Sequence, residues 1–268
     1  MVLHFVPGFA KLLRNFTIYQ TLSATVETGA GFVNFPTIVD GKKVAMKPIA
    51  IITARGGSKG IPGKNLMNFC GLPLIAWSIK QAQEASLDTY VSTEDEDIIR
   101  CAQEFGAKII YRPRELAADT SSSVDVLNHA IGVLRKQDFD TVVLLQPTSP
   151  LRLNGQINDM LDQYADGRYN YGFCFYRAKF IEWEEDKQPF PASTTPRRQE
   201  MNSRVIEHGM LYVYNENYLP LGMGELKNEN ILKYHTPEWQ AHELDEPQDI
   251  EICEYYMRKK ILCCSKVA

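Results

Sequence analysis

Residues 48–65 read PIAIITARGGSKGIPGKN, and this stretch decides the fold. Its first six residues form a short apolar run rich in isoleucine, which predicts a strand buried on both faces. A loop with four glycines follows directly, at the place where open α/β sheets bind their ligands. Glycine lets backbone amides come close to an anion, and Arg55, Lys59 and Lys64 add positive charge. The loop is therefore expected to bind a polyphosphate.

The charge pattern around this loop supports the same interpretation. Residues 41–83 contain seven basic side chains and no acidic one, although the whole chain has a formal net charge of −4. Two common phosphate-binding motifs do not fit. A P-loop needs Ser or Thr after Gly-Lys, whereas Asn65 follows Gly63 and Lys64, and the loop glycines do not keep the GxGxxG spacing. A solvated glycine-rich loop with incidental lysines remains the alternative.

The remaining chain alternates short β-rich runs with amphipathic segments, which predicts an α/β fold. Such alternation is typical of a mostly parallel central sheet flanked by helices. We predict further strands over 90–93, 108–111, 141–146, 171–176 and 210–214. We predict helices over 74–85, 95–105, 123–135, 157–164 and 247–262. A polar excursion over 179–204 separates the last two strands.

Composition limits the classes of protein that the chain can represent. Its 268 residues are 44% hydrophobic, which suits one large domain with a buried core. The acidic balance argues against a nucleic-acid partner. No apolar run approaches the roughly 20 residues that cross a bilayer, so no membrane association is expected. Six cysteines without a CxxC pair are expected to be reduced thiols of a cytoplasmic protein.

Residues 1–45 are treated as a poorly informative N-terminal extension. They contain amphipathic stretches and few acids, so they could be a targeting segment. They lack a continuous apolar core followed by a cleavage pattern, and Met46 directly precedes the first convincing strand, so a wrongly assigned upstream start is the alternative. The catalytic domain is expected over 46–268.

Several blocks, in the same order along the chain, resemble the CMP-sialic acid synthetases (N-acylneuraminate cytidylyltransferases), and the resemblance extends over residues 48–262. The loop 54–65 resembles the signature loop of that family. The other blocks are VSTE at 91–94, RPRELAADTSSS at 112–123, LLQPTSPLR at 144–152, and PRRQ at 196–199 with EHGMLY at 207–212. The resemblance implies a Rossmann-like nucleotidyltransferase fold and a homodimer built through the 179–204 excursion. His208 stands where the family usually has Asn.

The resemblance also implies roles for individual residues. Arg55, Lys59 and Lys64 would hold the triphosphate of CTP, with Arg55, Lys64 and Asp245 as the catalytic set. The substrate-binding set adds Ser92, the nucleotide-side positions Asn65, Arg112, Ser121 and Ser123, and Gln146 on the sugar side. Arg198 would bind the sugar carboxylate, because a guanidinium can do so with two hydrogen bonds.

Each of these positions also has a structural alternative. Arg112 could pair with Glu115 on the surface, and residues 121–123 could cap a helix. Gln146 could satisfy a loop backbone, and Arg198 could form a surface salt bridge.

Magnesium is the expected cofactor, because the family has a D-x-D pair late in the chain. The matching segment here reads Glu243-Leu244-Asp245. In extended backbone, residues i and i+2 face the same side, so both carboxylates could reach one Mg²⁺ ion. Asp245 is the stronger candidate for metal ligation, since Glu243 replaces the usual Asp. A charged turn before the last helix is the alternative.

The implied reaction transfers CMP from CTP to the anomeric hydroxyl of a nonulosonic acid, an acidic nine-carbon sugar of the sialic type. The hydroxyl would attack the α-phosphorus in line, releasing pyrophosphate. No side chain stands out as general base. Sialic, deaminated sialic, legionaminic and pseudaminic acids all stay open. The alternatives are CMP activation of an eight-carbon ulosonic acid, and a catalytically inactive nucleotide-binding module.

Overall fold

The computed structural model describes residues 35–39, 42–167, 169–181, 194, 196–216 and 231–263, with backbone only for 35–39, 42–45 and 167. Residues 34–268 form one compact unit, which begins before the 46–268 range expected for the catalytic domain. Two short strands, β1 (Phe35–Val39) and β2 (Lys42–Met46), pair antiparallel within the extension that the sequence left uninterpreted. The rest of residues 1–45 lies outside the described part, as does half of the 179–204 excursion.

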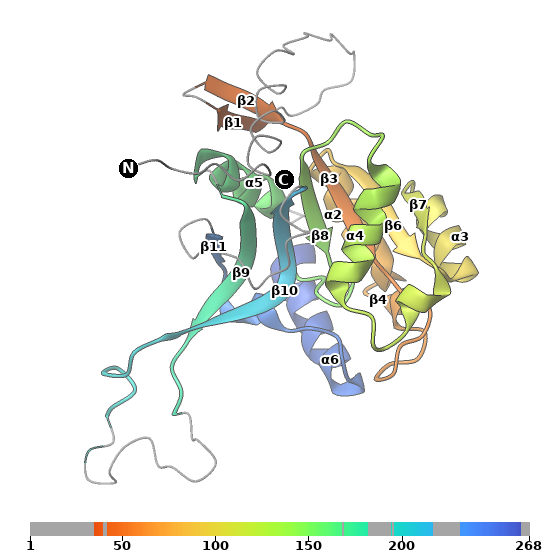
Figure 1. Ribbon diagram of the computed structural model, residues 1–268. Helices are drawn as coiled ribbons and strands as arrows, with labels where there is room; N and C mark the ends of the chain where they lie inside the picture. The colour runs from red at the N-terminus through yellow and green to blue at the C-terminus, as the bar shows by residue number, and fades with distance from the viewer. Residues whose placement is uncertain are drawn as a thin grey trace, which may run out of the picture. The chain divides into compact units, whose positions relative to one another are not determined.

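The described residues build a seven-stranded sheet, shown in Figure 1, with strand order β11-β9-β10-β8-β3-β6-β7. Its strands are β3 (Pro48–Thr53), β6 (Asp88–Thr93), β7 (Lys108–Tyr111), β8 (Thr141–Leu145), β9 (Tyr171–Ala178), β10 (Arg204–Asn215) and β11 (Ile231–His235). Four of the neighbouring pairs are parallel, and only β10 runs antiparallel to its neighbours. The expected mostly parallel α/β sheet is confirmed.

Helices cover both faces of this sheet. Successive residues of β3 point to opposite faces, so its side chains pack against helices on both sides. Ala50 and Ile52 pack in one core with α2 (Leu74–Glu84), α3 (Glu96–Glu104) and α5 (Gln156–Gly167). Ile49 and Ile51 pack in the other core with α4 (Ser123–Leu134), which lies in front of the sheet in Figure 1. Both faces of β3 are therefore buried, as its uninterrupted apolar run predicts.

Several predicted boundaries need correction. The helix expected over 95–105 begins one residue later, because the Asp95 side chain caps it by accepting hydrogen bonds from the amides of Asp97 and Ile98. The closing helix α6 (Pro247–Tyr256) gives way to π-helical η8 (Met257–Leu262) instead of continuing as one α-helix. Strand β10 is twelve residues long, since it pairs with β9 along the excursion as well as in the core.

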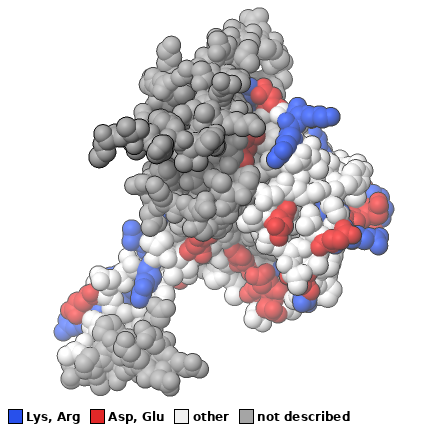
Figure 2. Space-filling model, in the orientation of Figure 1, with Lys and Arg blue, Asp and Glu red and all other residues white. Residues whose placement is uncertain are grey.

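The surface carries both signs of charge. On the described part of the face in Figure 2, Lys and Arg side chains are interspersed with Asp and Glu instead of forming one basic patch. Among the described residues, no helix combines the length and apolar character needed to cross a membrane.

Candidate active site

The glycine-rich loop leaves β3 at the carboxyl edge of the sheet and is fixed at both ends. The Ala54 amide donates to the Ser92 carbonyl on β6 at 3.0 Å, so the loop starts in register with the neighbouring strand. The Ser92 side chain itself is fully buried. Its contribution to the site in this arrangement is therefore the backbone carbonyl. At the other end, Asn65 is buried and donates from Nδ2 to the Arg55 carbonyl at 2.9 Å, which closes the loop on itself.

Lys64 connects this loop with the acidic segment before α6. It begins the short 3-10 helix η1 (Lys64–Leu66), and its ammonium donates to the Leu244 carbonyl at 2.6 Å and to Asp245 Oδ1 at 3.1 Å. The two segments also touch through backbone, since a Cβ added to Gly60 would lie 2.0 Å from the Asp245 carbonyl oxygen. Only glycine fits there. Lys64 and Asp245, two members of the predicted catalytic set, are therefore in direct contact, and the Arg55 backbone is joined to Asn65, the residue next to Lys64.

Arg55 and Lys59 share one carboxylate that the sequence analysis did not single out. Arg55 Nη1 donates to Asp119 Oδ1 at 2.8 Å, and Lys59 Nζ lies 2.8 Å from Asp119 Oδ2. Hydrogen bonds from Lys59 and Arg55, together with their charges, hold the pKa of Asp119 below its ordinary value. The two cations thus lie close enough together to bind one anionic group.

Arg112 forms a buried ion pair with Glu94, so the alternative of a surface pair with Glu115 is wrong. Arg112 Nε and Nη2 donate to Glu94 Oε2 at 3.0 and 2.8 Å, and the other carboxylate oxygen accepts from the Gly56 amide at 2.8 Å. Glu94 follows β6 and Arg112 follows the adjacent β7, which places both at the same edge of the sheet. Glu94 therefore links the glycine-rich loop to Arg112.

The serines of the 121–123 stretch have separate local roles. Ser122 is the N-cap of α4 and accepts from the Asp125 amide at 3.1 Å, with Asp125 completing a capping box. Ser121 Oγ donates to the Glu115 carbonyl at 2.9 Å. Ser123 is exposed as the first residue of α4. Helix capping therefore accounts for Ser122, whereas the two serines predicted to contact nucleotide do not cap the helix.

The sugar side of the predicted site is built around Gly209, in the irregular part of β10. A Cβ at Gly209 would lie 2.2 Å from Gln146 Oε1 and 2.8 Å from Glu243 Oε1, and the Gly209 amide donates to Glu243 at 2.6 Å. Burial raises the pKa of the Glu243 carboxyl; the Gly209 hydrogen bond opposes this, and the charge of Asp245 adds to it. Gln146 and both predicted metal carboxylates therefore lie in neighbouring positions.

A buried arginine, Arg152, connects the segments next to Gly209 and Gln146 through hydrogen bonds. Arg152 is 1% exposed and donates from Nε to the Met210 carbonyl at 2.6 Å and from Nη2 to the Gln146 carbonyl at 2.8 Å. Its Nη1 donates to Gln81 and Ser78 on α2. Burial lowers the pKa of Arg152 from its ordinary value. Arg152 thus holds the loop after β8 against the irregular part of β10, a role that its place in the 144–152 block did not show.

His208, at the position that departs from the family, is buried beside this arginine. Its Nε2 lies 2.8 Å from Thr236 Oγ1, whose own hydroxyl donates to the Phe175 carbonyl at 3.2 Å. The network therefore assigns the ring proton to Nε2. Burial and then the charge of Arg152 lower the pKa of His208 to about 4, so the ring is neutral near pH 7.

Glu243 and Asp245 suit a magnesium ion that is completed by phosphate and water. The described residues contain no group of three or more His, Cys, Asp or Glu able to hold a metal. Mg²⁺ in nucleotide sites commonly takes only one or two carboxylates, so a larger cluster is not required. Asp245 has an exposed carboxylate, and the pKa of Glu243 is raised mainly by burial, with repulsion from the charge of Asp245 adding to it. A divalent cation would relieve that repulsion.

Within one chain, Arg198 is not brought close to Gln146, Glu243 or Asp245. The last paired residues of β9 and β10 are Ala178 and Arg204, and Arg198 is an exposed residue beyond them. In Figure 1 these strand ends reach away from the rest of the sheet. The predicted contact of Arg198 with the sugar carboxylate therefore finds no support inside a single copy of the chain.

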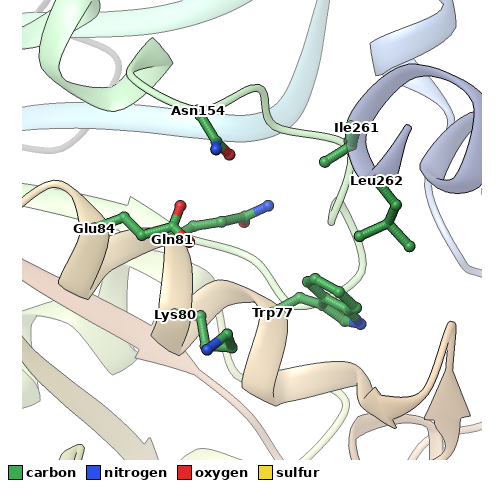
Figure 3. Close-up of a pocket in the computed structure, with 7 residues that line it drawn as sticks. All are labelled: Trp77, Lys80, Gln81, Glu84, Asn154, Ile261 and Leu262. Atoms are coloured by element: carbon green, nitrogen blue, oxygen red, sulfur yellow. The ribbon is translucent and has the colours of Figure 1, made fainter. Parts of the chain in front are cut away.

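A cavity of about 160 Å³ lies elsewhere, between α2, the loop after β8 and η8. Figure 3 shows that its walls come from Trp77, Lys80, Gln81, Glu84, Asn154, Ile261 and Leu262. None of the predicted site residues lines it. The candidate active site lies at the glycine-rich loop with its cations, and this cavity is separate from it.

Comparison with known proteins agrees with this geometry. A mostly parallel α/β sheet with a cationic glycine-rich loop in contact with Asp245 is the arrangement expected of an α/β nucleotidyltransferase. More narrowly, the chain belongs to the cytidylyltransferase family, whose model matches residues 49–259. It is 32% identical to N-acylneuraminate cytidylyltransferase B of Danio rerio over 215 residues, 76% of this chain and 50% of that protein. It is 42% identical to a pseudaminic acid cytidylyltransferase of Campylobacter jejuni over 134 residues, 48% of this chain and 58% of that protein.

Solved structures support the fold alone. A CMP:2-keto-3-deoxy-manno-octonic acid synthetase complexed with CTP matches with a TM-score of 0.60 at 20% identity, over 80% of this chain and 100% of that chain. A 4-diphosphocytidyl-2C-methyl-D-erythritol synthase of Anaerococcus prevotii matches with a TM-score of 0.58 at 13% identity, over 80% and 97% of the two chains. The chain spans about half the length of the curated relatives it matches.

Proposed function

We propose that this protein transfers CMP from CTP to the anomeric hydroxyl of a nonulosonic acid, giving a CMP-sugar and pyrophosphate. The observation that carries the proposal is the contact of Lys64 with Asp245, which joins the cationic loop to the predicted metal segment. Arg55 and Lys59, held together at Asp119, would bind the outer phosphates. Gln146 and Gly209 would border the sugar on the other side.

In the proposed reaction the cations of the loop act on the leaving group. Negative charge moves toward the β- and γ-phosphates as the α-phosphorus bond breaks, and preorganised Arg and Lys side chains stabilise that charge. Lys64 is the best placed of them, since two oxygens from the acidic segment fix its ammonium. The neutral ring of His208 and the buried charge of Arg152 would keep the sugar side rigid.

Asp245, with Glu243 beside it, would hold a magnesium ion bound to the triphosphate. Bound there, magnesium would neutralise phosphate charge and raise the electrophilicity of the α-phosphorus. With Asp245 engaged in this way, its contact with Lys64 would be given up, and the Lys64 ammonium could donate to a phosphate oxygen.

The relatives favour a nine-carbon acid over the eight-carbon alternative, and both sialic and pseudaminic acids are candidates within that class. The relatives matched in sequence are named for these two sugars. The neighbour named for an octonic acid is similar in fold at only 20% identity. Replacement of the family Asn by His208 lies on the sugar side, so the choice among nonulosonic acids is expected to depend on this region.

We further propose a cytoplasmic homodimer. Phe180, Ile181 and Val205 are exposed at 45, 43 and 43% on the outlying part of the β9–β10 hairpin, and such apolar groups suit a subunit interface. A partner chain could also bring its Arg198 toward the site. The described cysteines are free thiols, as a reducing compartment requires. Sedimentation analysis of the purified protein tests the dimer.

A pyrophosphate-release screen tests the proposed activity. The protein is supplied with CTP, Mg²⁺ and, in turn, sialic, deaminated sialic, legionaminic, pseudaminic and an eight-carbon ulosonic acid. We expect release with at least one nine-carbon acid, and Arg55→Ala should lower kcat/KM by about 10²–10³, the scale for one preorganised contact. The exposed Arg100→Ala on α3 is the matched control. Release with only the eight-carbon acid supports the first alternative, and CTP binding without any release supports an inactive module.

A further inference from the structure

Asp119 occupies the position between the two outer cations of the loop. Its Oδ1 accepts from Arg55 at 2.8 Å and its Oδ2 lies 2.8 Å from Lys59, so both carboxylate oxygens are used. The lowered pKa of Asp119 means that it is ionised at neutral pH. A phosphate that meets the same guanidinium and ammonium groups competes directly with this carboxylate.

The turn that carries Asp119 is anchored at its ends and lightly attached in the middle. Arg112 is tied to Glu94 before it, and Ser122 caps α4 after it. Within the turn, Ser121 donates from its amide to the Ala118 carbonyl at 3.0 Å, and residues 118–120 are all exposed. Little apolar burial fixes this turn against the loop. The two ion pairs of Asp119, with Arg55 and Lys59, are therefore the main connection between this turn and the glycine-rich loop.

We propose that Asp119 is an internal competitor that sets the affinity of the site for polyphosphate. The inference rests on the proposed function, which assigns Arg55 and Lys59 to the phosphates. A ligand binds these cations only in the fraction of molecules in which the carboxylate has left, and its apparent affinity falls by that fraction. Exposed ion pairs are weak individually, so a multiply charged triphosphate displaces Asp119 readily, whereas a weakly charged anion does so less completely.

The opposite role would be alignment of Arg55 for the phosphate, and the two roles predict changes of opposite sign. If Asp119 competes, removing its charge tightens polyphosphate binding. If Asp119 aligns Arg55, the same change weakens binding. Asp119→Asn is suited to separate them, because the side chain keeps its shape and exposed position while losing its charge.

Calorimetric titration with inorganic tripolyphosphate at fixed ionic strength tests the inference without catalysis. We expect Asp119→Asn to lower the Kd by about 3- to 10-fold, as the loss of two competing surface ion pairs allows. Asp88→Asn is the matched control. Asp88 pairs with Lys108 at 2.9 Å with similar exposure, and it starts β6 at the end of the strand away from the loop. The control removes the same charge and should leave the Kd within about twofold.

An unchanged or higher Kd for Asp119→Asn overturns the inference, and so does a decrease that Asp88→Asn reproduces. Failure of both the wild-type protein and Asp119→Asn to bind tripolyphosphate overturns it as well. Failure of the proposed function is recognised separately. In that case the Asp119→Asn tightening is observed, but no nonulosonic acid leads to pyrophosphate release from CTP.

Discussion

Gly60→Ala is the substitution that most directly strains the contact between the cationic loop and the acidic segment. The added Cβ would lie 2.0 Å from the Asp245 carbonyl oxygen, whereas real Cβ contacts do not fall below 3.0 Å. The loop and the Asp245 backbone must therefore move apart by at least about 1 Å, the difference between 3.0 and 2.0 Å. The obstructing atom belongs to the backbone, so rotation of a side chain cannot supply this movement. The contacts of Lys64 with Leu244 and Asp245 must lengthen.

We expect Gly60→Ala to lower kcat/KM for CTP about 100-fold, the cost of a 1 Å misplacement of reacting groups. Overpacking should destabilise the fold by about 1–3 kcal/mol, so the protein stays folded at assay temperature. Steady-state pyrophosphate release and denaturant unfolding measure the two effects. Gly132→Ala, on the exposed side of α4 where a Cβ meets nothing within 4 Å, is the control. If Gly60→Ala keeps a kcat/KM for CTP within about threefold of wild type, the contact between the loop and the acidic segment does not control the activity.

Two further substitutions test the metal segment and the buried histidine. Asp245→Asn should raise the Mg²⁺ concentration for half-maximal activity about tenfold or more. The unfolding free energy should change by under about 0.5 kcal/mol, because the side chain is exposed. Loss of stability with unchanged Mg²⁺ dependence would mark Asp245 as structural. The pKa of His208 is depressed to about 4, so its contribution to stability is present above pH 6.5 and lost as pH falls toward 4. Between pH 7.5 and 5 this loss is about 2 kcal/mol, and His208→Asn should remove it from the unfolding free energy. An equal acid sensitivity in the variant contradicts the assignment.

The central strands and the loop were predictable because their signals are local. An unbroken apolar run such as 48–53 can only be buried on both faces, and glycines with cations directly after it mark an anion site. Strand β11 was missed because it is an edge strand, where only Leu232 and Tyr234 are buried and a lysine faces outward between them. Its short alternation resembles a polar loop.

The partners within the site could not be read from sequence spacing, because the sheet brings distant residues together. Glu94 and Arg112 are 18 residues apart, and Arg55 and Asp119 are 64 apart. One signal was available for the first pair. Each residue directly follows a predicted strand, and parallel neighbours end at the same edge. Asp119 lies in the 112–123 block that resembles the family, but nothing in the sequence indicated its partners Arg55 and Lys59. No signal indicated the buried network of Arg152, which depends on how α2 packs against the loop after β8.

A crystal structure with CTP and Mg²⁺ bound would show whether the cationic loop holds the triphosphate. We expect triphosphate oxygens within about 3.2 Å of the Arg55, Lys59 and Lys64 side-chain nitrogens, with Asp119 displaced and the metal on Asp245. CTP bound in the cavity beside Trp77, with Asp119 still paired to Arg55, would contradict it.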